Sequence, residues 1–108
     1  MIDWSAVAQL RGEIGEEDFE AVVDVFLEEV EDKLQELASS PTDAYAAGFH
    51  FLKGSASYLG FHALQTVCAE AEKSARYGAY DTIDVDAVSA VYRQSRAHFL
   101  AGEARSVS

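Results

Sequence analysis

The segment EEDFEAVVDVFLEEVEDKLQELA, residues 16–38, carries the strongest structural signal in the chain. Its apolar residues recur at spacings of three and four, which is the period of one face of an α-helix. Acidic side chains occupy its first turn, where they complement the positive end of the helix dipole. The pattern predicts one amphipathic helix roughly 34 Å long, with one side buried. The residues expected on the buried side are Phe19, Val22, Val23, Phe26, Leu27, Val30, Leu34 and Leu37.

The same period continues on both sides of this helix. It predicts a short helix at residues 4–11 and longer helices at residues 43–59, 63–77 and 85–100. No segment has the alternating pattern of a convincing strand. Four amphipathic helices with short connections fold most simply as an antiparallel up-and-down bundle. We therefore expect an all-α fold, a four-helix bundle with a short extra N-terminal helix.

Several residues indicate where these helices begin and end. Asp3 is a candidate N-cap for the first helix, and Gly12 and Gly15 are expected to break it. Ser40 or Thr42 is expected to cap the helix at residues 43–59, with Pro41 tolerated at its entry and Gly60 at its end. Gly102 is expected to end the last helix and leave residues 103–108 as a flexible tail. The whole chain, residues 1–108, is expected to form one domain.

Composition narrows the classes of partner. The chain has 19 acidic and 8 basic residues, a net charge of −11. Such a charge repels nucleic acids and anionic lipid, so neither is an expected partner, and a solvated surface explains the acidity most simply. The start of the chain has no secretory signal pattern, and no apolar run approaches the ~18 residues of a membrane span. We therefore expect a cytoplasmic monomer. Cys68 is the single cysteine, and we expect it to be an inert buried thiol.

The helix expected at residues 43–59 has one face that does not suit a core. At 100° per residue, Leu52, Leu59 and Tyr45 lie opposite His50, so His50 is expected to project outward. Phe49 and Phe51 are expected to flank its strip at about 100° to each side. The neighbours of His50 along the strip are Ala46, Ala47, Lys53, Gly54 and Ser57.

This strip suits phosphoryl transfer. A glycine in mid-helix costs about 1 kcal/mol relative to alanine, so Gly54 suggests a need for close approach to the histidine. Lys53 places a cation beside the same imidazole, which is a potential nucleophile. The alternative is a surface histidine with an incidental lysine and a glycine that serves helix packing. The pattern alone favours neither interpretation.

Glu72 is a candidate partner for His50. If the turn between the third and fourth helices is centred near Phe61, residues 50 and 72 lie level, and Glu72 sits at the edge of the contact. Its carboxylate could then accept the Nδ1 proton of His50 and leave Nε2 free to attack phosphorus. The alternative is a solvated glutamate, as most glutamates in an acidic protein are.

The stretch HFLKGSASYLG, residues 50–60, closely resembles the signature of the histidine-containing phosphotransfer (HPt) family. The likeness extends to GEEDFEAVVDVFLEEVEDKLQEL, similar to the family's first long helix, and to ALQTVCAEAEKSARYG, similar to the helix after the site. The resemblance implies that His50 is the phosphoacceptor, that Lys53 helps to neutralise the phosphoryl group, and that Glu72 orients His50. Phe49 departs from the family, where alanine is frequent, and would make that side of the strip bulkier.

The resemblance also implies partners and chemistry. A phosphoaspartate on a response-regulator receiver domain would give its phosphoryl group to Nε2 of His50, and a second receiver would take it. A hybrid histidine kinase is an expected upstream partner. The receiver would supply Mg²⁺, and the chain itself would need no cofactor or metal. The residues expected to dock the partner are Ala46, Ala47, Phe51, Gly54 and Ser57. No P-loop and no kinase-type glycine-rich loop occurs, so we expect a phosphoryl carrier and not an enzyme.

Three alternatives remain. The chain could be a scaffold or phosphate sink that binds receivers without onward transfer. It could be a metal-binding bundle, but His50, His62 and His98 form no i, i+4 pair, and the last two are expected on the surface. It could also be a phosphoacceptor domain of a larger histidine kinase, although Met1 favours a free-standing protein.

Overall fold

The computed structural model describes residues 2–107, and the side chains of residues 2–103. These residues form five α-helices and two short 3-10 turns, and apart from one isolated bridge between Ile2 and Phe61 they contain no β-structure. The helices are α1 (Trp4–Ile14), α2 (Glu16–Ala38), α3 (Tyr45–Leu59), α4 (His62–Arg76) and α5 (Val85–Val107). The 3-10 turns are η1 (Thr42–Ala44) and η2 (Tyr80–Thr82).

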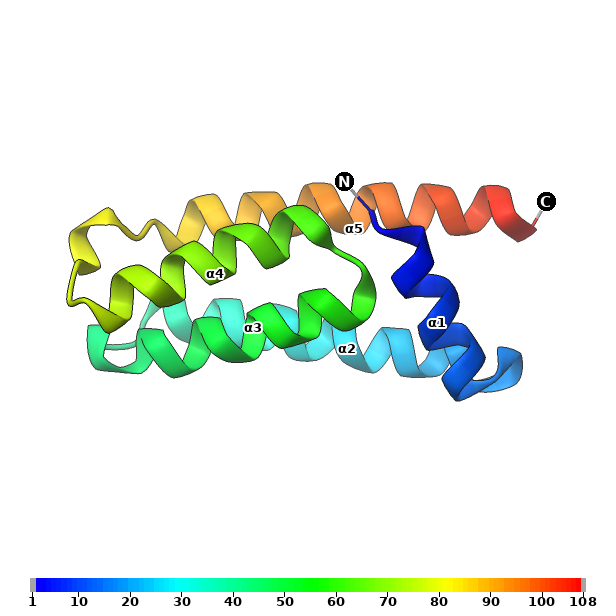
Figure 1. The fold of residues 1–108 in the computed structure, drawn as a ribbon, viewed down its shortest axis with the longest axis horizontal. Coiled ribbons are helices and arrows are strands. Elements are labelled where there is room, and N and C mark those ends of the chain that lie inside the picture. The colour runs from blue at the N-terminus through cyan, green and yellow to red at the C-terminus, as the bar shows by residue number, and fades with distance from the viewer. Residues whose placement is uncertain (1, 108) are drawn as a thin grey trace.

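Helices α2 to α5 run alternately in opposite directions along the long axis of the molecule, and α1 crosses one end of them (Figure 1). The predicted all-α bundle with an extra N-terminal helix is confirmed, and the predicted range of α2 is that of the structure. Helices α2 and α5 have 23 residues each, whereas α3 and α4 have 15. The longer pair therefore extends beyond the shorter pair, and α1 covers the end where it does so.

The start of α1 is as predicted, and its end is not. Oδ1 of Asp3 accepts hydrogen bonds from the backbone N–H groups of Ser5 and Ala6, at 3.0 and 3.3 Å. The helix continues through Gly12 to Ile14, because a single glycine weakens a helix without ending it. Gly15 does end it, with a φ of 96° that side-chain-bearing residues rarely adopt.

Contacts with α5 hold α1 in place. The Trp4 ring stacks on the Phe99 ring with centroids 5.9 Å apart, and Nη2 of Arg11 lies 2.6 Å from Oε2 of Glu103. Gly102 was predicted to end α5, but the helix passes through it and continues to Val107. A Cβ at Gly102 would lie 2.2 Å from Cζ2 of Trp4, so this glycine makes room for the Trp4 ring. The expected tail is thus helical as far as residue 107, and residue 108 lies outside the described residues.

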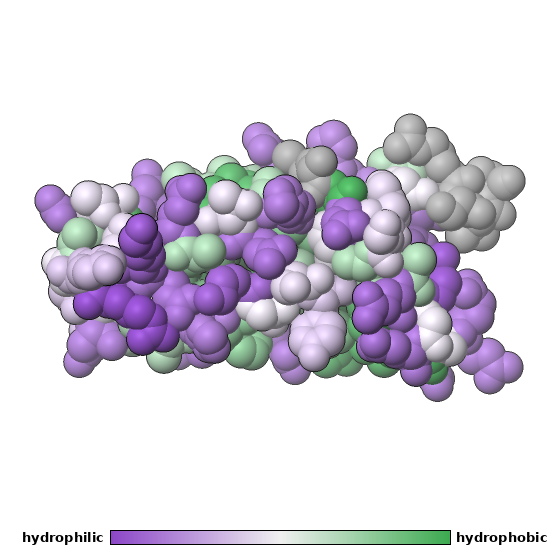
Figure 2. Space-filling model, viewed as in Figure 1, coloured by the Kyte–Doolittle hydropathy of each residue, from purple (hydrophilic) through white to green (hydrophobic). Residues whose placement is uncertain are grey.

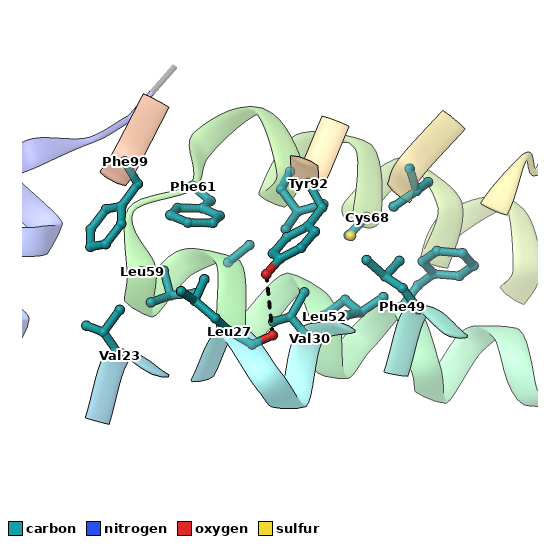
Figure 3. Close-up of a cluster of buried hydrophobic side chains, with 14 of the residues drawn as sticks. Val23, Leu27, Val30, Phe49, Leu52, Leu59, Phe61, Cys68, Tyr92 and Phe99 are labelled. Atoms are coloured by element: carbon teal, nitrogen blue, oxygen red, sulfur yellow. Dashed lines mark hydrogen bonds between the residues drawn. The ribbon is translucent and has the colours of Figure 1, made fainter. Parts of the chain in front are cut away.

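Side chains from all four long helices meet in one core (Figure 3). Among those drawn there are Val23, Leu27, Val30, Phe49, Leu52, Leu59, Phe61, Cys68, Tyr92 and Phe99. The Tyr92 hydroxyl crosses the core and donates to the backbone oxygen of Leu27 at 3.4 Å and to Oε2 of Glu31 at 2.5 Å. Cys68 is fully buried, as predicted, and this burial raises the pKa of its thiol from 9.0 to about 12, which disfavours the reactive thiolate.

The connections around α3 differ in detail from the prediction. Neither Ser40 nor Thr42 caps the helix, which follows the η1 turn and begins at Tyr45 without a side-chain cap. Ser40 instead donates its hydroxyl to the backbone oxygen of Glu36 at 2.7 Å. Gly60 ends α3 as predicted, with a φ of 73°.

None of the helices in the described part of the chain is long and apolar enough to cross a membrane.

Candidate functional site

His50 lies in the middle of α3 and points away from the core. Its side chain is 64% exposed, whereas Leu52 and Leu59 on the opposite side of the helix are buried completely or almost so. The orientation predicted for these three residues is confirmed. The imidazole is therefore open to solvent from a helix that the core holds firmly.

The predicted level match between α3 and α4 is also confirmed. The two helices reverse direction over Gly60 and Phe61, where the N–H of Phe61 donates to the backbone oxygen of Ala56 at 2.9 Å. This tight turn sets α3 and α4 antiparallel and brings Nδ1 of His50 to 3.0 Å from Oε2 of Glu72.

Glu72 was predicted to lie at the edge of the contact between α3 and α4, and the structure shows it to be more enclosed. It is only 6% exposed, yet three cationic or potentially cationic groups surround its carboxylate. Lys53 and then Arg76 lower the pKa of Glu72 from 4.5 to about 2, against the opposing effect of burial. Glu72 is therefore ionised at neutral pH and can only accept hydrogen bonds. A neutral His50 ring must then carry its proton on Nδ1 and leave the Nε2 lone pair free.

Lys53 also binds Glu72. Its Nζ lies 2.7 Å from Oε1, and its side chain is 35% exposed. The sequence predicted a cation beside the imidazole. The structure instead shows this cation paired with the carboxylate that holds His50.

Arg76 is the one member of this cluster that the sequence analysis missed. Its Nε and Nη2 lie 3.1 and 2.7 Å from Oε2 of Glu72, the oxygen that also accepts from His50. Spacing could have revealed it, because a glutamate and an arginine four residues apart on a helix face each other. Lys53, Glu72 and Arg76 line one open groove together with Ala69, Lys73 and Tyr77. In Figure 2 the most hydrophilic colour lies at the end of the molecule where α4 ends.

The strip around His50 is open, as predicted. Ala47, Gly54 and Ser57 are exposed, Ala46 is half-buried, and Phe51 is 38% exposed. A Cβ added at Gly54 would meet no atom within 4 Å, so this glycine does not serve packing within the chain.

Phe49 does not flank this strip. It is fully buried in the core, with its ring edge-on to Tyr45 at a centroid distance of 5.8 Å. The prediction that Phe49 makes one side of the strip bulkier is therefore wrong. The buried arc of α3 is wide enough to include a residue 100° away from His50, because both α2 and α4 pack against this helix.

Gly48 is the glycine of α3 that serves packing. It is buried, and a Cβ there would lie 2.6 Å from Cδ2 of Leu37 on α2. Close approach of α2 and α3 thus depends on Gly48, and Gly54 in the same helix is left on the open surface. Glycine is therefore present at the two positions for different physical reasons.

The other histidines lie apart from this site. His62 and His98 are exposed, as predicted. Among the described residues, no group of three or more His, Cys, Asp or Glu side chains is placed to hold a metal ion.

The site lies within a stretch that matches a known family. The family model described as the Hpt domain matches residues 21–94, a span that includes His50, Lys53, Glu72 and Arg76. Neither the curated proteins nor the solved structures contain a detectable match to the chain. The match covers more than half of the chain, and the chain therefore belongs to the Hpt domain family, whose members act as phosphotransfer intermediates in phosphorelays and interact with receiver domains.

Proposed function

We propose that His50 accepts a phosphoryl group from the aspartyl phosphate of one receiver domain and passes it to the aspartate of another. The observation that carries this proposal is the pairing of an exposed imidazole with a buried, ionised carboxylate. Nδ1 of His50 lies 3.0 Å from Glu72, and the His50 side chain is 64% exposed. Such a pairing supports a free Nε2 lone pair that faces solvent, where a partner can reach it.

The transfer step follows from this tautomer. The Nε2 lone pair attacks phosphorus, and an N–P bond forms as the P–O bond to the receiver aspartate breaks. The aspartate leaves as a carboxylate with the electron pair, and the Nδ1 proton of His50 stays in place. Positive charge that develops on the ring lies beside the ionised Glu72, which favours the transition state. Transfer to the second receiver is the same step in reverse.

Other residues of the site would assist the transfer. Lys53 would help to neutralise the phosphoryl group, and the open strip of Ala46, Ala47, Phe51, Gly54 and Ser57 would contact the receiver surface. We expect the receiver to supply the Mg²⁺ and a hybrid histidine kinase to stand upstream. The chain would then contribute a nucleophile, its orientation and part of the charge.

The test is transfer of a radioactive phosphoryl group from a phosphorylated receiver. The wild-type protein should acquire label that is labile to acid and stable to base, as a phosphohistidine is. His50→Gln should abolish the label and retain the helical circular dichroism spectrum, because the side chain faces solvent. His62→Gln is the matched control and should be labelled like the wild type. Undiminished label on His50→Gln would refute the assignment.

A second receiver separates a carrier from a sink. When an unphosphorylated receiver is added to labelled protein, a carrier should lose its label to that receiver. Retention of the label on His50 would show a receiver-binding scaffold or phosphate sink.

A further inference from the structure

Two cations hold opposite oxygens of the Glu72 carboxylate. Nζ of Lys53 lies 2.7 Å from Oε1, and the guanidinium of Arg76 contacts Oε2 through Nε at 3.1 Å and Nη2 at 2.7 Å. Nδ1 of His50 shares Oε2 with Arg76. With a neutral imidazole, this cluster has a net charge of +1 in a chain whose net charge is −11. It is therefore locally suited to an anionic group.

Phosphorylation of His50 would change the contacts of Lys53. A phosphoryl group on His50 would attract the Lys53 ammonium, which sits on a flexible four-carbon stem one helical turn from the histidine. Departure of Lys53 from Oε1 would remove one of the cations that compensate a carboxylate only 6% exposed. A buried charge without a compensating partner is strongly unfavourable, so a second cation must remain.

The geometry of Arg76 suits it to be that second cation. Its guanidinium directs two N–H groups at one oxygen in a rigid fork, which holds the carboxylate in position as well as compensating its charge. It lies on the same helix as Glu72, four residues further on, so the pair does not depend on the position of α3. Because Arg76 binds Oε2 of Glu72, Lys53 can leave Oε1 while Glu72 keeps its contact with His50.

We propose that Arg76 is a positioning residue, which holds Glu72 in place so that Lys53 can exchange Oε1 of Glu72 for the phosphoryl group on His50. This proposal rests on the proposed function. Without Arg76, Lys53 would be retained by Glu72, and the phosphoryl group would lose its cation. Arg76 would thus act through Glu72 and not through contact with the phosphoryl group.

The decisive experiment measures Arg76→Gln in two backgrounds. In the wild-type background, Arg76→Gln should slow phosphoryl transfer from a receiver about tenfold, the equivalent of one charge-assisted hydrogen bond. In the Glu72→Gln background, the same change should have an effect of less than about twofold, because residue 72 then carries no charge to compensate. An equal slowing in both backgrounds would show direct contact between Arg76 and the phosphoryl group and would overturn the proposal.

The effect of Lys53→Ala provides a second readout that a purely structural role would not change. Lys53→Ala should slow transfer in the wild type and have a smaller effect in Arg76→Gln, where Lys53 is already retained by Glu72. Equal effects of Lys53→Ala in the two backgrounds would count against the exchange. Arg76→Lys should restore part of the rate, because it restores the charge without the fork.

Controls separate this proposal from the proposed function. Arg93→Gln removes the same charge from an exposed position on α5, outside the groove, and should leave transfer unchanged. Circular dichroism should show the same helical content in every variant. If the wild type accepts no label on His50, the proposed function fails. If it accepts label and Arg76→Gln transfers at the wild-type rate, only the role of Arg76 is refuted.

Discussion

Oε2 of Glu72 lies 3.0 Å from Nδ1 of His50, although 22 positions separate the two residues in the sequence. The contact exists because α3 and α4 are joined by a turn of only two residues, Gly60 and Phe61, and run back antiparallel. Glu72 is buried and ionised, while the imidazole it contacts is largely exposed. The pair therefore combines a fixed acceptor with an accessible nucleophile.

Removal of the Glu72 carboxylate should slow transfer and free the tautomer of His50. Glu72→Ala should reduce the transfer rate about tenfold, because a hydrogen bond to a charged group contributes somewhat more than 1 kcal/mol. Glu72→Gln should reduce it less, since an amide oxygen can still accept from Nδ1. Ring-nitrogen chemical shifts of His50 in the two variants would measure the tautomer. Shifts and rates like those of the wild type would show that Glu72 plays no part in orienting the ring.

The stabilising contribution of Glu72 should depend on pH in the acid range. Lys53 and Arg76 lower the pKa of Glu72 from 4.5 to about 2, so folding favours its ionised form. The contribution should be complete above about pH 4.5 and disappear as the pH falls towards 2. The free energy of unfolding of the wild type should therefore approach that of Glu72→Gln as the pH is lowered through this range. A difference that stays constant from pH 7 to 2.5 would contradict the low pKa.

A long side chain at Gly54 should block docking without disturbing the fold. Gly54→Gln meets no atom of the chain near its Cβ, so the free energy of unfolding should stay the same or rise slightly. Transfer from a receiver should be strongly slowed, because the side chain would stand where the receiver must pack. Phosphoramidate, a small donor that needs no docking surface, should label Gly54→Gln and wild type alike. Gly54→Ala is the matched control, and fast transfer from receivers to Gly54→Gln would refute the clearance argument.

Gly48 should respond in the opposite way. A methyl group there would lie 2.6 Å from Cδ2 of Leu37, which is itself 1% exposed and has little room to move. Gly48→Ala should lower the free energy of unfolding by about 1–3 kcal/mol through overpacking, partly offset by the better helix propensity of alanine. Urea unfolding of Gly48→Ala and Gly54→Ala, one methyl group added to the same helix in each, would compare the two positions directly. Equal stabilities would show that α2 can move away from α3 without loss.

Much of this protein can be read from local sequence patterns. The spacing of apolar residues in residues 16–38 predicted α2 with its correct bounds, and the same period predicted the all-α bundle. The exposure of His50 followed from the angular position of Leu52 and Leu59, and the level match with Glu72 followed from a turn centred near Phe61. These features are local, or they follow from the geometry of regular helices, so the sequence alone determined them.

Features that depend on contacts between different helices were decided by the tertiary structure. Gly12 and Gly102 look like helix ends, but the chain is helical through both, and at Gly102 the ring of Trp4 takes the place of a side chain. Phe49 was expected to flank the open strip and is buried, because both α2 and α4 pack against α3. The burial of Glu72 and its sharing between Lys53, Arg76 and His50 likewise arise only when α3 and α4 pack, because a carboxylate shared by two helices needs both of them in place.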